Sequence, residues 1–167
     1  MSVSVKTDSL IYRKPCMQDG AAMWRLVRDS GGLDLNSAYA YLMMADMFPD
    51  TCAVAYAGEK LAGFIMGYRK PGQQDTLFIW QIGVDSSCRG AGVGRKLLEE
   101  LLERKENIAV RFVEATVGPN NAASKALFLG LAARRQAGCT IHEYYPQSLF
   151  PSGEQHEAEL LFRIDLG

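Results

Sequence analysis

Three glycines stand between a predicted strand and a predicted helix. Residues 89–94 read R-G-A-G-V-G; the apolar segment TLFIWQIGV precedes them at 76–84, and the helical pattern RKLLEELLERK follows at 95–105. Backbone N–H groups that small residues leave exposed at the start of a helix bind phosphate well. We therefore expect this turn to hold a ligand that carries phosphate.

The spacing of the glycines discriminates among three such ligands. A nucleoside triphosphate loop needs Gly-Lys followed by Ser or Thr, whereas Gly94 precedes Arg95 and Lys96. A dinucleotide fingerprint needs a third glycine at position 95 and crossover helices before the turn, where this sequence predicts hairpins. Glu114 lies where a ribose-binding acid would, so a nicotinamide cofactor is disfavoured but stays open. Coenzyme A is the third candidate.

Composition limits the kind of partner. The chain has 167 residues, of which 48% are hydrophobic and 22% charged, and its net charge is -1. These values are typical of one folded domain over residues 1–167, without the basic surface that binds nucleic acid or a membrane. No apolar run approaches the roughly 20 residues of a membrane span. We expect a cytoplasmic protein whose ligand is small, with no nucleic-acid or membrane partner.

The cysteines and histidines predict no metal. The four cysteines lie at 16, 52, 88 and 139, far apart and without a C-x-x-C pair, and the two histidines lie at 142 and 156. Zinc sites and disulfide frameworks need closer or more regular spacing.

The spacing of hydrophobic residues, together with capping and helix-ending residues, predicts the helices and strands that position the turn. Asp19 is expected to cap a helix to about 29, and Asn36 a second helix to about 47, whose residues Tyr39, Leu42 and Asp46 share one apolar face. The other predicted elements are strands at 10–14 and 110–117, a hairpin of 51–56 with 61–69, a helix at 122–132 and a last strand at 159–166. A single mixed α/β domain is the simplest interpretation.

Two motifs together resemble the acyl-CoA signature of the GNAT acetyltransferase superfamily. R-x-x-G-x-G is met by Arg89, Gly92 and Gly94, and P-x-N-x-x-S-x-x-L-F by PNNAASKALF at 119–128. The resemblance implies a twisted mixed sheet, split near its middle and flanked by helices, with acetyl-CoA as co-substrate. It assigns acyl-CoA binding to Ile82, Val84, Arg89, Gly90, Gly92, Val93, Gly94, Arg95, Asn121, Ser124 and Phe128.

The chain departs from that superfamily at two catalytic positions. Phe128 stands where many members have a tyrosine that protonates the leaving thiolate, and the strand at 76–84 lacks the glutamate that often acts as base. The acid is then expected to be Tyr144, Tyr145 or water. The base is expected to be Glu157, Glu159, His156 or an ordered water.

Further stretches resemble a narrower family, the diaminobutyrate acetyltransferases of ectoine biosynthesis. They are LDLNSAYAYLMMADMFPDTCAVA at 33–55, DTLFIWQIGVDSSCRGAGVG at 75–94, TVGPNNAASKALF at 116–128 and HEAELLFRIDL at 156–166. The resemblance implies acetylation of the γ-amine of L-2,4-diaminobutyrate, a role in osmotic stress and a homodimer. An acetyltransferase for another small amine and a non-catalytic acyl-CoA sensor are the alternatives.

The acceptor residues are chosen to suit a substrate with two amines. Carboxylates must keep the α-ammonium charged and unreactive, and Asp34 and Asp46 are expected to do so. Tyr39 is expected to donate to the α-carboxylate and Trp80 to wall the alkyl chain. Three of the four also have a plain structural interpretation: Asp34 in a turn, Asp46 in solvent at a helix end, and Trp80 in the core.

Overall fold

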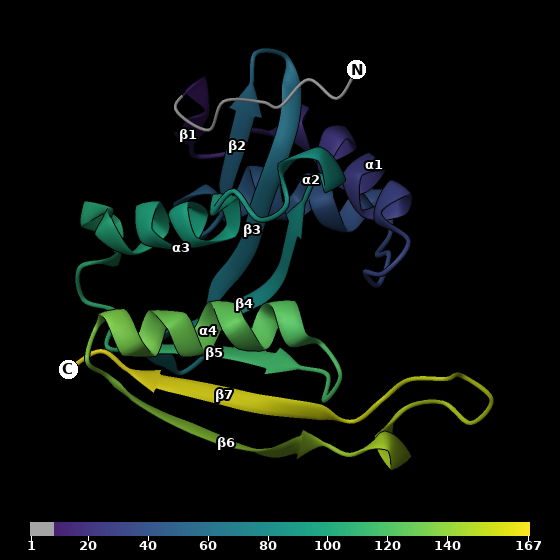
Figure 1. Ribbon diagram of the computed structural model, residues 1–167, viewed down its shortest axis with the longest axis vertical. Coiled ribbons are helices and arrows are strands. Elements are labelled where there is room, and N and C mark those ends of the chain that lie inside the picture. The colour runs from purple at the N-terminus through teal and green to yellow at the C-terminus, as the bar shows by residue number, and fades with distance from the viewer. Residues whose placement is uncertain (1–8) are drawn as a thin grey trace. The chain divides into compact units, whose positions relative to one another are not determined.

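The computed structural model describes residues 9–167, which divide into two units (Figure 1). The first unit runs up to Tyr68 and resumes at Trp80–Ile108, and the second comprises Arg69–Ile79 with Ala109–Gly167. Strands β3 (Lys60–Lys70) and β4 (Gln73–Val84) each run from one unit into the other.

The first unit is built on an antiparallel sheet. Strand β1 (Ile11–Arg13) pairs with β2 (Ala53–Ala57), and β2 pairs with β3 through the predicted hairpin. Helices α1 (Gly20–Ser30) and α2 (Ala38–Met47) bury Met23, Val27 and Tyr41 against Phe64 of β3. Burying side chains of this size from water is the main stabilising term of such a core.

Helix α3 (Val93–Glu103) packs against the other face of β3. A Cβ atom on Gly63 would lie 3.0 Å from the Val93 side chain and 3.0 Å from the Gly83 carbonyl oxygen. Because side chains alternate along a strand, Gly63 faces α3 while Phe64 faces α1 and α2. Helices therefore cover both faces of this part of the sheet, as predicted.

The second unit contains a mixed sheet and one helix. Strand β5 (Phe112–Val117) lies parallel to β4 and antiparallel to β7 (Glu159–Asp165), which pairs in turn with β6 (Gly138–Tyr145). Helix α4 (Ala122–Arg134) buries Phe128 against Phe162 of β7, with ring centroids 6.5 Å apart. The pairs of β4 with β5 run from Thr76↔Phe112 to Ile79↔Ala115, while β5 continues to Val117 on β7.

Most predicted elements are confirmed, and three details were wrong. Ser37, not Asn36, caps α2, since its side chain accepts a hydrogen bond from the Ala40 N–H at 3.2 Å. Asp19 precedes α1 but its side chain is buried and gives no cap. Strand β6 was not expected, because its residues are almost all exposed and lack an apolar alternation.

Within residues 9–167, no helix is both long and apolar enough to cross a membrane.

Candidate active site

The glycine turn has the geometry of an anion site. A one-turn 3₁₀ helix, Ser86–Cys88, leads from β4 to Arg89, and Gly90 and Gly92 adopt φ angles of 77° and 78°. Gly92 occupies the cap position of α3 without a side chain, so the first N–H groups of the helix have no side-chain acceptor from the cap. Those N–H groups and the helix dipole favour a phosphate group.

The remaining predicted residues of the turn lie around these donors. Arg89 and Arg95 are exposed, and Val93 is buried as the first residue of α3. Arg95 lies 3.3 Å from Glu99, one helical turn further on. Exposed guanidinium groups beside free backbone donors suit a diphosphate.

Strand β4 carries the two residues predicted to meet the pantetheine arm. Ile82 and Val84 are half-buried on either side of Gly83. A Cβ at Gly83 would come within 2.7 Å of Phe64 and 2.8 Å of Leu26, so Gly83 faces α1 and Ile82 and Val84 face away from it.

A buried tyrosine and a glutamine hold the loop that carries Asp34. The fully buried Tyr41 donates its hydroxyl to Gln81 Oε1 at 2.7 Å, and Gln81 Nε2 donates to the Asp34 carbonyl oxygen at 2.7 Å. The predicted acid is thereby fastened to β4 beside Trp80, which is 41% exposed. Sequence reasoning missed Gln81 and Tyr41, although a glutamine inside an apolar strand was a signal.

The predicted acidic face of α2 is exposed. Tyr39, Leu42 and Asp46 are accessible to solvent, and the helix buries Tyr41, Met44 and Ala45 instead. Tyr39, Leu42 and Asp46 lie on one face of α2 as predicted, but that face does not pack on the core. Tyr39 and Asp46 are thus accessible to a ligand.

In the second unit, three of the predicted bases lie together where the chain enters β7. The ring of His156 stacks on Phe150 with centroids 3.8 Å apart, and its Nδ1 lies 2.7 Å from the Glu157 carbonyl oxygen. His156 Nε2 lies 3.9 Å from the Glu159 carboxylate. Asn120 Nδ2 donates to Glu157 Oε1 at 2.5 Å.

The Glu157 carboxylate also lies close to the backbone of Gly118. A Cβ on Gly118 would lie 3.2 Å from Glu157 Oε2, so the carboxylate lies against the backbone just beyond β5. That region follows the point where the β4–β5 pairs end. Asn120, unnoticed in the sequence, is therefore the side chain that orients one of the candidate bases.

Tyr144, the candidate acid, lies at an irregularity of β6. The register with β7 shifts between Glu143 and Tyr145, and bulges of this kind re-aim a side chain. Tyr144 is 42% exposed and its ring lies edge-on to that of Tyr145, with centroids 4.6 Å apart.

Two residues of the P-x-N-x-x-S-x-x-L-F motif stabilise α4. Asn121 caps the helix, because its side chain accepts a hydrogen bond from the Ser124 N–H at 3.1 Å. Phe128 is only 2% exposed and packs on Phe162. Their predicted contacts with acyl-CoA stay predictions.

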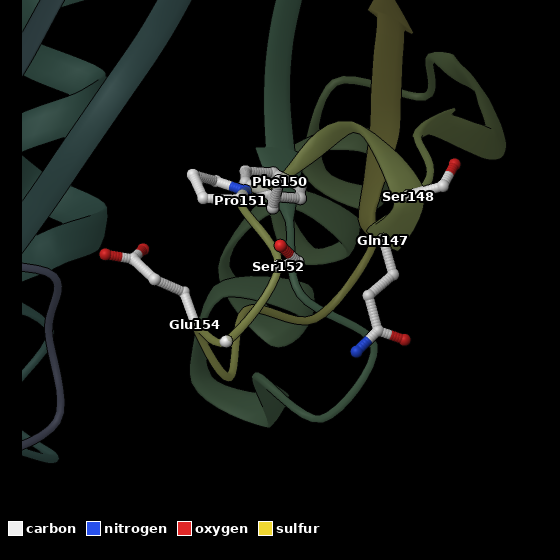
Figure 2. Close-up of a pocket in the computed structure, with 7 residues that line it drawn as sticks. Gln147, Ser148, Phe150, Pro151, Ser152 and Glu154 are labelled. Atoms are coloured by element: carbon white, nitrogen blue, oxygen red, sulfur yellow. The ribbon is translucent and has the colours of Figure 1, made fainter.

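Two further features are separate from these residues. A hollow of about 400 Å³ within one loop (Figure 2) is lined by Gln147, Ser148, Phe150, Pro151, Ser152 and Glu154, and none of them was a predicted site residue.

The Glu114 side chain is buried, and its carboxylate pairs with Lys70 Nζ at 2.8 Å and with Arg163 at 2.5 Å, as an internal hydrogen-bonding acid does. In the described part of the chain, no three His, Cys, Asp or Glu residues are grouped as a metal site would need.

Comparison with known proteins places these features in a family. The model of the acetyltransferase (GNAT) family matches residues 21–131. The L-2,4-diaminobutyric acid acetyltransferase of Shouchella clausii is 50% identical over 98% of this chain and 90% of its own length. That of Halalkalibacterium halodurans is 52% identical over 90% of this chain and 79% of its own length.

Solved structures agree with the sequence relatives. Diaminobutyrate acetyltransferase EctA from Paenibacillus lautus, in complex with its substrate L-2,4-diaminobutyric acid and coenzyme A, has a TM-score of 0.91 and 43% identity, covering 93% of this chain and 94% of that one. The ribosomal-protein-S18-alanine N-acetyltransferase of Escherichia coli, at 20% identity and a TM-score of 0.67, shares the fold.

Proposed function

The chain belongs to the GNAT family of acetyltransferases, among the L-2,4-diaminobutyric acid acetyltransferases, and on that premise we propose that it acetylates the γ-amine of L-2,4-diaminobutyrate. Acetyl-CoA is the acetyl donor. The observation that carries the proposal is the likeness, over nearly the whole chain, to an enzyme solved with that substrate and coenzyme A.

The donor side of the reaction rests on the glycine turn. The N–H groups from Val93 onward bind the diphosphate of acetyl-CoA, with Arg89 and Arg95 beside it. The backbone of β4 at Ile82 and Val84 pairs with the pantetheine amides. Asn121 keeps its side-chain N–H₂ group for the cofactor, because its oxygen is engaged in capping α4.

The acceptor side must distinguish two amines. Asp34 and Asp46 hold the α-amine as an ammonium ion, which has no lone pair for attack. Tyr39 donates to the α-carboxylate, and Trp80 bounds the alkyl chain. The γ-amine is left to react.

The chemical step needs one base and one acid. An alkyl amine with a reference pKa of about 10.4 must lose a proton before it attacks. Glu157, oriented by Asn120, is the proposed acceptor of that proton, with Glu159 and His156 as its neighbours. The amine nitrogen then bonds to the thioester carbonyl carbon, the carbon–sulfur bond breaks as the carbonyl forms again, and Tyr144 gives a proton to the thiolate. The second proton that the nitrogen loses on becoming an amide leaves through solvent, which returns a proton to Tyr144.

We also propose the fate of the acetylated product, the cellular compartment of the reaction and the oligomeric state of the enzyme. N-γ-acetyl-2,4-diaminobutyrate is the compound that an ectoine synthase cyclises, and we place the reaction in the cytoplasm, where acetyl-CoA is available. A homodimer is supported by the exposed apolar side chains Leu35, Leu42 and Met47 in and just before α2. Analytical ultracentrifugation tests the dimer, and a monomer at micromolar concentration would refute it.

The decisive experiment offers the purified protein acetyl-CoA with diaminobutyrate, ornithine, lysine or spermidine, and follows thiol release and product by NMR. We expect acetyl on the γ-nitrogen of diaminobutyrate alone. Acetylation of a different amine would replace the substrate, and coenzyme A binding without thiol release would favour a sensor.

Variants of the acceptor acids separate an enzyme from a sensor. Asp34→Asn and Asp46→Asn are expected to raise KM for diaminobutyrate and to leave coenzyme A affinity unchanged. Asp29→Asn is the matched control, since Asp29 is exposed at the end of α1 and pairs with its sequence neighbour Arg28.

A further inference from the structure

The connection from β4 to the glycine turn is fixed by Asp85. Its backbone N–H donates to the Ala62 carbonyl oxygen at 2.8 Å, and its own carbonyl oxygen accepts from the Cys88 N–H at 2.9 Å. Its carboxylate accepts from the Ser87 N–H at 3.0 Å and from the Ser87 hydroxyl. The residue thus sets the path of the chain immediately before Arg89.

The first residue of β3, Lys60, approaches this carboxylate. Lys60 Nζ lies 3.2 Å from Asp85 Oδ2 and 3.4 Å from Ser87 Oγ. Partial burial pushes the pKa of Asp85 upward, but hydrogen bonds from Ser87 and Lys60 outweigh it, and the pKa is lowered. Asp85 is therefore ionised at neutral pH.

An ionised carboxylate is an unfavourable neighbour for an anion-binding turn. Asp85 precedes Arg89 by four residues and Gly92 by seven. A negative charge this near in the chain repels a diphosphate, and an adjacent cation cancels most of that repulsion. Lys60 therefore offsets the negative charge that Asp85 brings to the approach to the turn.

We propose that Lys60 and Asp85 are a positioning pair for acetyl-CoA: Asp85 holds the approach to the diphosphate turn, and Lys60 neutralises Asp85 without touching the ligand. This inference rests on the proposed function, because it takes the glycine turn as the diphosphate site. It assigns to the first residue of β3 a role in acetyl-CoA affinity that neither sequence motif indicates.

A double-mutant cycle tests the pair. Lys60→Gln is made in the wild-type chain and in Asp85→Asn, since asparagine keeps the capping oxygen but carries no charge. In the wild-type chain, Lys60→Gln should raise the Kd for coenzyme A and the KM for acetyl-CoA about two- to fivefold, the size of one exposed charge contact. The kcat should be unchanged, Asp85→Asn alone should lower the Kd, and the double variant should return to about the wild-type Kd because it lacks both charges of the pair.

A control variant distinguishes the loss of the Lys60 charge from the loss of any exposed lysine charge. Lys105→Gln removes an exposed lysine beyond the far end of α3 and should leave the Kd for coenzyme A unchanged. The effect of Lys60→Gln should shrink in high salt, because the charges concerned are partly exposed. Thermal melting of each variant shows that it is folded.

Three results would overturn the inference. A double variant that binds as weakly as Lys60→Gln alone would mean that the Asp85 charge plays no part, and an unchanged Kd in Lys60→Gln would remove the role of the lysine. A fall in kcat with unchanged KM for acetyl-CoA would move the pair to the chemical step. Failure of the wild-type chain to bind coenzyme A would reject the proposed function itself, whereas binding without acetylation of diaminobutyrate would leave the positioning pair standing.

Discussion

Replacing Asp19 by Asn is expected to destabilise the protein in a way that depends on pH. Asp19 is 3% exposed and accepts hydrogen bonds from Arg13 at 2.8 and 2.9 Å, the Cys16 N–H at 2.8 Å and the Tyr56 hydroxyl at 2.7 Å. Burial pushes the pKa of Asp19 upward, but these donors prevail and lower it from 3.8 to about 2. The folded state therefore favours the ionised carboxyl.

The sign and size of the effect follow from proton linkage. Because the folded pKa lies below the unfolded one, the stabilisation is complete above pH 3.8 and is lost as the pH falls through 2. It amounts to about 2.4 kcal/mol at pH 7 and about 1.3 kcal/mol at pH 3. Asparagine carries no charge and turns an N–H₂ group toward donors, so Asp19→Asn should forfeit all of it.

Urea unfolding of the two proteins at pH 7 and pH 3, followed by circular dichroism, measures the difference. The gap in the free energy of unfolding should narrow by about 1 kcal/mol between the two pH values. Asp29→Asn, which removes an exposed acid, should show no such gap. A gap of constant size, or none at pH 7, would refute the linkage argument.

Three further predictions concern the site. Tyr41→Phe removes the hydroxyl that anchors Gln81 and should raise KM for diaminobutyrate about three- to tenfold, while a parallel rise for acetyl-CoA would contradict it. Asn120→Ala frees the Glu157 carboxylate and should lower kcat about tenfold in steady-state assays near neutral pH; an unchanged kcat would remove Glu157 as the oriented base. Gly92→Ala forces a side chain into a φ of 78° and should weaken coenzyme A binding about fivefold by calorimetry, so unaltered affinity would show that the turn adapts.

The position of the glycine turn between a strand and a helix was predictable from the sequence. A glycine turn acts through backbone groups, so its residue types and spacing carry most of the information. The hairpin, α3, α4 and β7 were likewise predicted, because each has a local period or cap that needs no distant partner. The resemblance to the diaminobutyrate acetyltransferases was confirmed by relatives that match over most of the chain.

The surroundings of the candidate acceptor and base residues depended on contacts between distant segments. Gln81 meets Asp34 across 47 positions of sequence, and Asn120 meets Glu157 across 37. No period or motif encodes such pairs, since the folded sheet and loops alone decide which polar atoms come within hydrogen-bond distance. The same holds for the exposed face of α2, because helical spacing groups Tyr39 with Asp46 but only tertiary packing chooses the face that is buried.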